Sequence, residues 1–258
     1  MSTALITGGT RGIGLSITES LVNAGYDIVI VARDQERLDD VVGDLSKAYA
    51  GQTVSGISCD VTEPGDVKVM VAEAAEVLGS VDLLVNCAGR SGGGVTKDIE
   101  RDLWLSVIDT NLNSVFYVTK EVLETGAMGE GGSIVNIAST GGKQGVMYGA
   151  PYSAAKHGVV GFTKALGLEL ARDNASITVN AVCPGFVETP MAEKVRSNYA
   201  KIWEVSPEEA KSRIEARIPI GRYIEPDEVA GMVLYLASKQ ARGITAQAMN
   251  VCGGLGNY

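Results

Sequence analysis

Residues that bind metals or form disulfides are scarce in this chain of 258 residues. It has one histidine, His157, and four cysteines, Cys59, Cys87, Cys183 and Cys252, with no Cys-x-x-Cys pair among them. A zinc site needs several such ligands at close spacing, so we expect no metal site. Widely spaced cysteines are typical of free, buried thiols in a reducing compartment.

The chain also lacks a long apolar run and an excess of positive charge. No segment approaches the roughly 20 apolar residues of a membrane span, and no charged-then-apolar leader opens the sequence. The net charge of -9 disfavours nucleic acid and anionic membrane surfaces as partners. We therefore predict a cytoplasmic protein that binds neither nucleic acid nor membrane.

Short apolar runs rich in Val and Ile recur along the whole chain. They are Ala4–Thr7, Asp27–Ala32, Val54–Cys59, Leu83–Asn86, Ser133–Ile137, Ile177–Val182 and Ala246–Val251. Gly, Asn or Asp bounds these runs, and their continuous apolar character is typical of strands buried on both faces of a sheet. Segments with helical patterns lie between them: Gly14–Ala24, Gln35–Ala50, Pro64–Leu78, Arg101–Glu124 as one helix or two, Tyr152–Ala171 and Pro226–Ser238.

This alternation of strand and helix predicts an α/β fold. We expect a single doubly wound domain over residues 1–258, with a seven-stranded parallel sheet flanked by helices. The long connection at about 188–222, which has a helical pattern over Ser206–Arg217, interrupts the alternation. Such long connections are usually functional, so we predict a helical lid over a substrate site.

A glycine-rich segment, Thr7–Gly14, joins the first strand to the first helix. Glycines at this place let the backbone approach a pyrophosphate, which the helix N-terminus then stabilises. The position predicts a Rossmann-type dinucleotide site, and a simple tight turn is the alternative. The second strand ends in Ala32 and Arg33, where an NAD site would place a carboxylate. Arg33, with Arg11 as a second cation, instead favours the 2′-phosphate of NADP over two merely solvated arginines, although Asp34 is close by.

Tyr152 and Lys156 are four residues apart and so share one helix face. A cation within about 4–6 Å lowers the pKa of a tyrosine from its ordinary value near 10 toward the range of neutral acid–base work. Ser139 follows a strand end, where α/β sheets bind their ligands, and Asn111 lies in the preceding helical region. His157 follows Lys156 but points elsewhere on the helix, so we interpret it as structural.

Together, Thr7–Gly14, Asn86–Gly89, Asn111, Ser139, the Tyr152 and Lys156 pair and Pro184-Gly185 resemble the classical short-chain dehydrogenases/reductases along nearly the whole chain. The resemblance implies that Tyr152 donates a proton, that Lys156 lowers its pKa and holds the nicotinamide ribose, that Ser139 orients the carbonyl and that Asn111 anchors a relay water. The cofactor residues it implies are Gly8, Thr10, Arg11, Gly12, Ile13, Gly14, Arg33, Asp60 at the adenine, Val61, Asn86, Ala88, Gly89, Tyr152, Lys156, Pro184, Gly185, and Val187 and Thr189 at the carboxamide.

A narrower resemblance comes from residues 139–145, Asn180–Met191, Ile202–Val205 and the tail Asn250–Tyr258. These segments are similar to the ketoreductases of bacterial aromatic polyketide synthases, of the actinorhodin type. That resemblance implies a homotetramer that uses NADPH to reduce one ketone, typically at the ninth carbon, of a poly-β-keto chain on an acyl carrier protein. Its implied substrate residues are Ser91, Gly92, Gly93, Thr140, Gln144, Val146, Phe186, Met191, Tyr199 and Trp203, of which about half of the last four are expected to pack the lid instead.

The sequence leaves the roles of two residues undecided, and three alternative functions have to be considered. Ser91 stands where the similar ketoreductases have proline, so the handedness of the product is not predicted. Arg90 is a candidate for the phosphate of a phosphopantetheine arm, or a solvated arginine. A 3-oxoacyl carrier-protein reductase or a small-molecule alcohol dehydrogenase uses the same catalytic residues. A catalytically inactive dinucleotide sensor typically lacks the Tyr or Lys, and both are present here.

Overall fold

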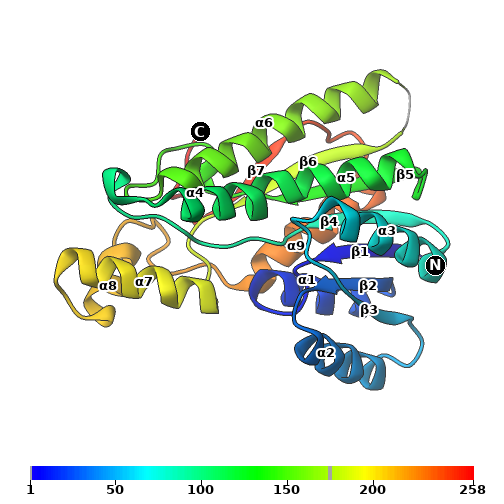
Figure 1. The fold of residues 1–258 in the computed structure, drawn as a ribbon, viewed down its shortest axis with the longest axis horizontal. Coiled ribbons are helices and arrows are strands. Elements are labelled where there is room, and N and C mark those ends of the chain that lie inside the picture. The colour runs from blue at the N-terminus through cyan, green and yellow to red at the C-terminus, as the bar shows by residue number, and fades with distance from the viewer. Residues whose placement is uncertain (1, 174–175) are drawn as a thin grey trace.

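A computed structural model describes residues 2–173 and 176–258. Its strands form one parallel sheet in the order β3-β2-β1-β4-β5-β6-β7 (Figure 1). The strands are β1 (Thr3–Thr7), β2 (Asp27–Ala32), β3 (Val54–Ser58), β4 (Val81–Asn86), β5 (Met128–Ile137), β6 (Thr178–Pro184) and β7 (Ala248–Val251). The chain order reverses between β1 and β4, which is the switch point where doubly wound sheets bind ligands. The predicted fold class is confirmed.

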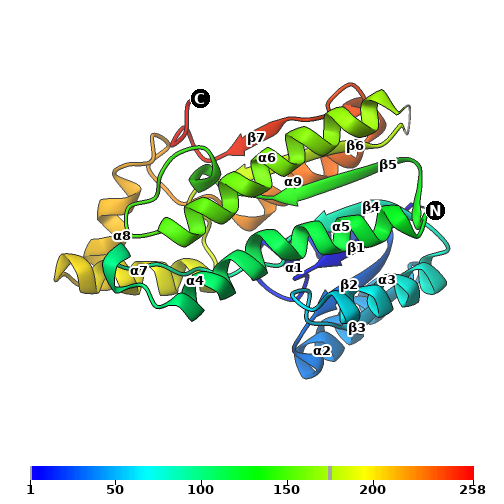
Figure 2. The ribbon, with the colours of Figure 1, turned by 45° about the horizontal axis from the view of Figure 1, so that its top comes forward.

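Helices cover both faces of this sheet. They are α1 (Gly12–Asn23), α2 (Gln35–Ala48), α3 (Pro64–Leu78), α4 (Arg101–Ile108), α5 (Ser114–Glu124), α6 (Ala150–Arg172), α7 (Pro190–Trp203), α8 (Pro207–Glu215) and α9 (Pro226–Ala237). Apolar side chains of α1, α2 and α9 form one core with the sheet, and those of α3, α5 and α6 form another. In Figure 2, α5 and α6 lie in front of the sheet and α9 lies behind it.

The structure refines the predicted elements in two places. The predicted Arg101–Glu124 helix is α4 and α5, joined by a π-helical turn over Asp109–Asn113. Strand β5 begins at Met128, earlier than the predicted Ser133, and its pairing with β4 is irregular between Val81 and Leu83. Gly and Glu residues at 129–132 hide this first part of the strand from a pattern based on apolar runs.

The lid is a small helical unit with an apolar core of its own. Helix α7 begins at the N-cap Thr189 and ends at Glu204, whose φ of 53° is left-handed. Helix α8 begins at the N-cap Ser206, whose side chain accepts a hydrogen bond from the Glu209 amide. Figure 1 shows the two helices projecting at one end of the molecule. The predicted helical connection is therefore present, with a second helix that sequence patterns had not defined.

None of the helices in residues 2–173 and 176–258 is both long enough and apolar enough to cross a membrane.

Candidate active site

The glycine-rich loop brings the start of α1 close to the ends of β1 and β4. Gly8 has a φ of 71°, and a Cβ there would lie 2.8 Å from the Ala88 Cα atom. A Cβ at Gly14 would overlap the carbonyl oxygen of Gly8. Thr7 completes the contact, since its Oγ1 accepts hydrogen bonds from the amides of Cys87 (3.1 Å) and Ala88 (3.2 Å). The loop is thus a backbone cradle that admits no side chain at Gly8 or Gly14. It lies at the positive end of α1 and fits a dinucleotide pyrophosphate.

Asn86, at the end of β4, adds an unused acceptor beside this cradle. Its Nδ2 donates to Asn136 Oδ1 (2.8 Å) and Thr119 Oγ1 (3.0 Å). Its Oδ1 is buried and has no hydrogen-bond partner within the part of the chain that the structure describes. A buried orphan acceptor is costly, so this position is also suited to a ligand that donates a hydrogen bond.

Arg33, the first of the two predicted cations, directly follows the end of β2. Arg33 is exposed and its Nη1 lies 3.6 Å from Asp60 Oδ2, so the 2′-phosphate and adenine candidates form an ion pair. Partial burial acts to raise the pKa of Asp60, but hydrogen bonds from Thr62 and the nearby Arg33 hold it below its usual value. Arg37, which sequence reasoning missed, donates through Nε to the carbonyl oxygen of Thr10 at 2.9 Å.

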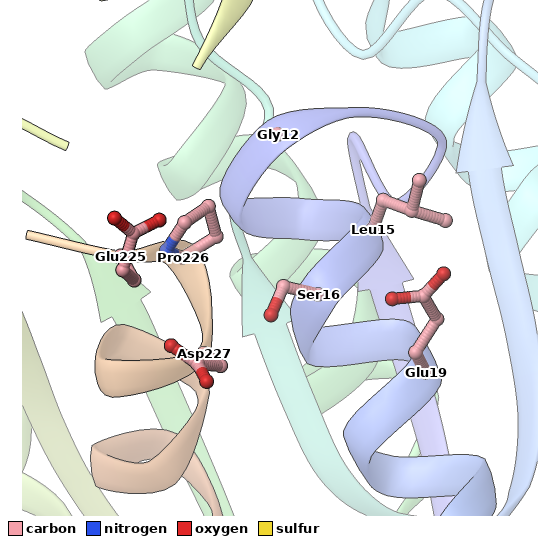
Figure 3. Close-up of a pocket in the computed structure, with 7 residues that line it drawn as sticks. All are labelled: Gly12, Leu15, Ser16, Glu19, Glu225, Pro226 and Asp227. Carbon is pink, nitrogen blue, oxygen red and sulfur yellow. The ribbon is translucent and has the colours of Figure 1, made fainter. Parts of the chain in front are cut away.

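A shallow hollow of about 330 Å³ lies on the other side of the loop, between the first turns of α1 and α9 (Figure 3). Its polar lining is largely acidic, with the carboxylates of Glu19, Glu225 and Asp227. Carboxylates repel phosphate groups. This hollow is therefore unsuited to the phosphates of a dinucleotide.

Ser139 and Tyr152 meet at the carboxyl edge of the sheet. Ser139 follows β5, and Tyr152 lies in the first turn of α6. The two side chains lie close together, since a Cβ at Gly141 would be 3.4 Å from both Ser139 Oγ and Tyr152 Cε1, and the Ser139 hydroxyl lowers the pKa of Tyr152. The Ser139 Oγ atom also accepts from the Gly141 amide at 3.0 Å, which fixes its orientation. Two hydroxyls held together in this way can contact one carbonyl oxygen from two sides.

The predicted direction of the Tyr152 pKa shift is wrong in this structure. Burial raises the pKa of Tyr152 above its ordinary value, and the Ser139 hydrogen bond lowers it without offsetting the burial. Lys156 Nζ lies 5.9 Å from the centre of the Tyr152 ring and donates to the Ile137 carbonyl oxygen at 2.7 Å. The neutral phenol is thereby favoured, which suits a proton donor.

Lys156 is itself strongly affected by its surroundings. It is 5% exposed, and burial lowers its pKa to about 8. Gly89 lies next to it, since a Cβ there would be 3.9 Å from Nζ and 3.0 Å from Asn111 Oδ1. The ammonium group thus lies between the end of β4 and α6, where the resemblance leads us to expect a ribose of the cofactor.

Asn111 occupies the π-helical turn and is 1% exposed. Its Nδ2 donates to the carbonyl oxygens of Val107 (2.9 Å) and Arg90 (3.0 Å), and its Oδ1 accepts from the Arg90 amide at 3.2 Å. Asn111 therefore anchors the loop that follows β4. π-Turns inside helices are frequent at functional sites, but apolar periodicity does not reveal them.

The predicted substrate loop Ser91–Gly93 is closely packed. A Cβ at Gly92 would overlap Val107, and one at Gly93 would overlap the carbonyl oxygen of Tyr148, which also accepts from the Gly94 amide at 2.7 Å. Tyr148 itself has a φ of 60°, an uncommon backbone conformation for a bulky residue. The loop and the Tyr148 turn therefore form one rigid edge of the site. Arg90 Nη1 donates to Ser106 Oγ at 2.7 Å beside it.

The other predicted substrate residues lie in two groups. Thr140 is buried, whereas Gln144 and Val146 are half-buried in the same turn after Ser139. The lid residues Phe186, Tyr199 and Trp203 belong to its apolar core, in which Tyr199 stacks on Trp203 with ring centres 4.7 Å apart. Met191 is 38% exposed. More of the lid residues pack internally than the half that was expected.

Salt bridges join the lid helices to the segment that contains Val187 and Thr189, the residues predicted to contact the nicotinamide carboxamide. Glu188, between Val187 and Thr189, pairs with Arg196 of α7 and with Lys211 of α8 at 3.1 Å. Partial burial acts to raise its pKa, but these two cations hold it below the usual value. Thr189 also lies against the cradle, because a Cβ at Gly12 would be 3.3 Å from its Cγ2 atom. One short segment thus connects both lid helices to the dinucleotide loop.

A family model described as enoyl-(acyl carrier protein) reductase matches residues 8–256. The chain belongs to the short-chain dehydrogenase/reductase family. This confirms the predicted family and its oxidoreductase class. The predicted positions of the family's catalytic residues, namely Asn111, Ser139, Tyr152 and Lys156, come together as described above.

Similar proteins narrow the comparison for this short-chain dehydrogenase/reductase. A ketoacyl reductase of the granaticin polyketide synthase from Streptomyces violaceoruber is 59% identical over 99% of this chain and 93% of its own length. A ketoacyl reductase from Streptomyces coelicolor is 58% identical over 99% and 97%. The crystal structure of an actinorhodin polyketide ketoreductase variant with NADPH is 58% identical, covers 100% of this chain and 98% of that one, and has a TM-score of 0.95.

Proposed function

We propose that this protein is an NADPH-dependent ketoreductase that reduces one ketone of a poly-β-keto chain carried on an acyl carrier protein. The observation behind it is that Ser139, Tyr152 and Lys156 lie close together beside a glycine cradle. The lid with its aromatic core contacts the turn before α6, since the Tyr199 hydroxyl donates to the Met147 carbonyl oxygen at 3.4 Å. The related polyketide ketoacyl reductases support the substrate class. By the same resemblance, the reduced position is the ninth carbon and the product belongs to antibiotic biosynthesis.

The residues divide the chemistry among themselves. NADPH, when bound in the cradle, would supply hydride to the ketone carbon. Ser139 would donate a hydrogen bond to the ketone oxygen, and Tyr152 would transfer its hydroxyl proton to that oxygen. Lys156 would hold the nicotinamide ribose, and Asn111 would belong to the path that returns a proton to Tyr152.

The charged residues near the end of β2 are the reason for proposing NADPH rather than NADH as the cofactor. Ala32 leaves no carboxylate at the end of β2, while Arg33 and Arg37 approach the same edge of the cradle. A 2′-phosphate would compete with Asp60 for Arg33 and pair with the free guanidinium donors of Arg37. The actinorhodin relative solved with NADPH supports this choice.

The cytoplasm is the proposed compartment, and a homotetramer is the proposed assembly. Trp104 and Leu105 on α4 and Phe116 on α5 are exposed, and these large apolar side chains lie on neighbouring helices. Exposed apolar patches of this kind often mark protein interfaces. Arg90 at the rim remains the proposed contact for a phosphopantetheine phosphate.

Turnover of two ketones tests the substrate class. We expect NADPH-dependent reduction of a bicyclic ketone to proceed at a rate comparable with, or above, that of a short acetoacetyl thioester. Fast thioester reduction beside negligible turnover of the bicyclic ketone would instead favour the alternative, a 3-oxoacyl carrier-protein reductase or a small-molecule alcohol dehydrogenase.

A further inference from the structure

The turn that contains Ser139 is bonded to a segment more than a hundred residues further along the chain. Tyr258 donates through its hydroxyl to the carbonyl oxygen of Thr140 at 3.3 Å. The same oxygen accepts from the amides of Lys143 and Gln144, both at 3.0 Å. Thr140 directly follows Ser139, so this contact acts on the backbone next to the proposed catalytic hydroxyl.

Lys143 forms a second link to the same segment. Its Nζ donates to the Ala248 carbonyl oxygen and Asn250 Oδ1, both at 2.9 Å, and to the Tyr258 carbonyl oxygen at 3.3 Å. It also lies 5.4 Å from the centre of the Tyr258 ring. An ammonium group has three N–H donors, and these contacts use all of them. Lys143 therefore acts on the fold of the site rather than on a ligand.

The opposite side of the turn fits closely on the catalytic helix. A Cβ at Gly142 would lie 2.8 Å from the carbonyl carbon of Lys156. The turn is thus held between α6 on one side and residues 248–258 on the other. A shift of the turn would move the Ser139 hydroxyl relative to Tyr152, because Tyr152 is on α6.

Residues 248–258 are themselves well anchored. Asn250 Nδ2 donates to the Gly256 carbonyl oxygen at 2.9 Å, and the Gly256 amide donates to Cys252 Sγ at 3.3 Å. The Gly185 amide donates to the Val251 carbonyl oxygen at 3.0 Å, which ties the segment to the proposed cofactor site. A segment fixed at several points can fix in turn the part of the site that rests on it.

We propose that Lys143 and Tyr258 are positioning residues for the proposed reaction. They hold the turn of residues 139–143 against α6, so that the Ser139 hydroxyl stays close to the Tyr152 side chain. This inference rests on the proposed function, since its kinetic effect is measured as ketone reduction.

The Lys143→Met variant tests the positioning role most strongly. It keeps the aliphatic stem and removes the ammonium, and we expect kcat for the bicyclic ketone to fall roughly tenfold, since small misplacements of reacting groups are costly. NADPH affinity, measured by fluorescence titration, should change less than about twofold, because uniform binding is not affected. The matched control is Lys47→Met, since Lys47 is exposed and pairs only loosely with Asp44 at 3.9 Å.

Tyr258→Phe is the milder variant, and it tests the positioning role if Lys143→Met does not fold. It removes only the hydroxyl that bonds Thr140, and we expect kcat to fall about threefold with little change in melting temperature. Tyr235→Phe is its control, because Tyr235 is an exposed residue of α9.

Two readouts separate positioning from simple loss of stability. The Ser139 hydrogen bond lowers the pKa of Tyr152. Weakening it should raise that pKa, so the alkaline loss of reductase activity should begin at higher pH in Lys143→Met than in the wild type. Hydrogen–deuterium exchange should be faster at residues 141–144 in both variants, and this readout needs no activity.

Unchanged exchange at residues 141–144 together with wild-type kcat in Tyr258→Phe and in a folded Lys143→Met would overturn the positioning role. A wild-type protein that reduces neither ketone would instead contradict the proposed function. The exchange measurement would still test whether Lys143 and Tyr258 hold the turn of residues 139–143.

Discussion

The two halves of the site are built in different ways. The cofactor side is made mostly of backbone, since Gly8 and Gly14 allow contacts that any side chain would block. The substrate side is made of side chains on separate elements, which charges and aromatic contacts hold together. Substitution of Gly8 or Gly14 should therefore disrupt cofactor binding, whereas the substrate side can change its selectivity while the cofactor still binds.

The largest expected effect is a fall in kcat without a matching fall in NADPH affinity. Tyr152→Phe removes the proposed proton donor and should lower kcat roughly a thousandfold, within the range for general acid catalysis. NADPH affinity should change little, because the phenol acts mainly in the transition state. Steady-state kinetics and fluorescence titration measure the two quantities. A variant that retained most of its activity would contradict the role of Tyr152.

A substitution in the glycine-rich loop should instead lower NADPH affinity. Gly14→Ala places a methyl group on the Gly8 carbonyl oxygen, so the cradle must open, and we expect NADPH affinity to fall about a hundredfold along with a destabilisation of about 1–3 kcal/mol. Gly43→Ala is the control. Gly43 lies within α2 with open space around its Cα, so alanine there should stabilise the helix by up to about 1 kcal/mol. Similar results for both variants would rule out the backbone cradle.

The two arginines near β2 should affect cofactor choice. Arg33→Ala and Arg37→Ala should each raise the KM for NADPH about tenfold, since each removes a charge-assisted contact to phosphate. The KM for NADH serves as the internal control and should change far less. Equal changes for the two cofactors would mean that the 2′-phosphate is recognised elsewhere.

The smallest expected effect concerns the lid. Glu188→Gln keeps the shape of the side chain but weakens its pairs with Arg196 and Lys211, so we expect the KM for the bicyclic ketone to rise about threefold with NADPH affinity nearly unchanged. Glu209→Gln, which weakens an exposed pair with Arg213 on α8, is the control. An equal rise in both variants would show that general lid stability, not the Glu188 connection, determines ketone binding.

The cofactor side was also the easier half to predict. Its glycines are contiguous in sequence and lie between an apolar run and a helix, so their role follows from local pattern. Most strands were predicted for the same reason, because they are continuous buried runs, although the edge strands β3 and β7 are only half-buried. Pro64 at the start of α3 set that helix boundary correctly, as proline fits the first turn.

The substrate side depends on contacts that local pattern does not contain. The Tyr152 pKa was predicted to fall because Lys156 is four residues away, but burial dominates and the ammonium is bonded to Ile137. The contacts of Lys143 with residues 248–258 join segments that only the tertiary fold brings together. The resemblance to known ketoreductases identified Tyr199 and Trp203, but only the structure shows that they stack within the lid core.

Reconstitution with a minimal polyketide synthase and its carrier protein tests the central claim most directly. The expected product is a polyketide in which one ketone, at the ninth carbon, is reduced to an alcohol, and the Tyr152→Phe variant should leave that position as a ketone. Identical products with the wild type, the variant and no added reductase would contradict the account.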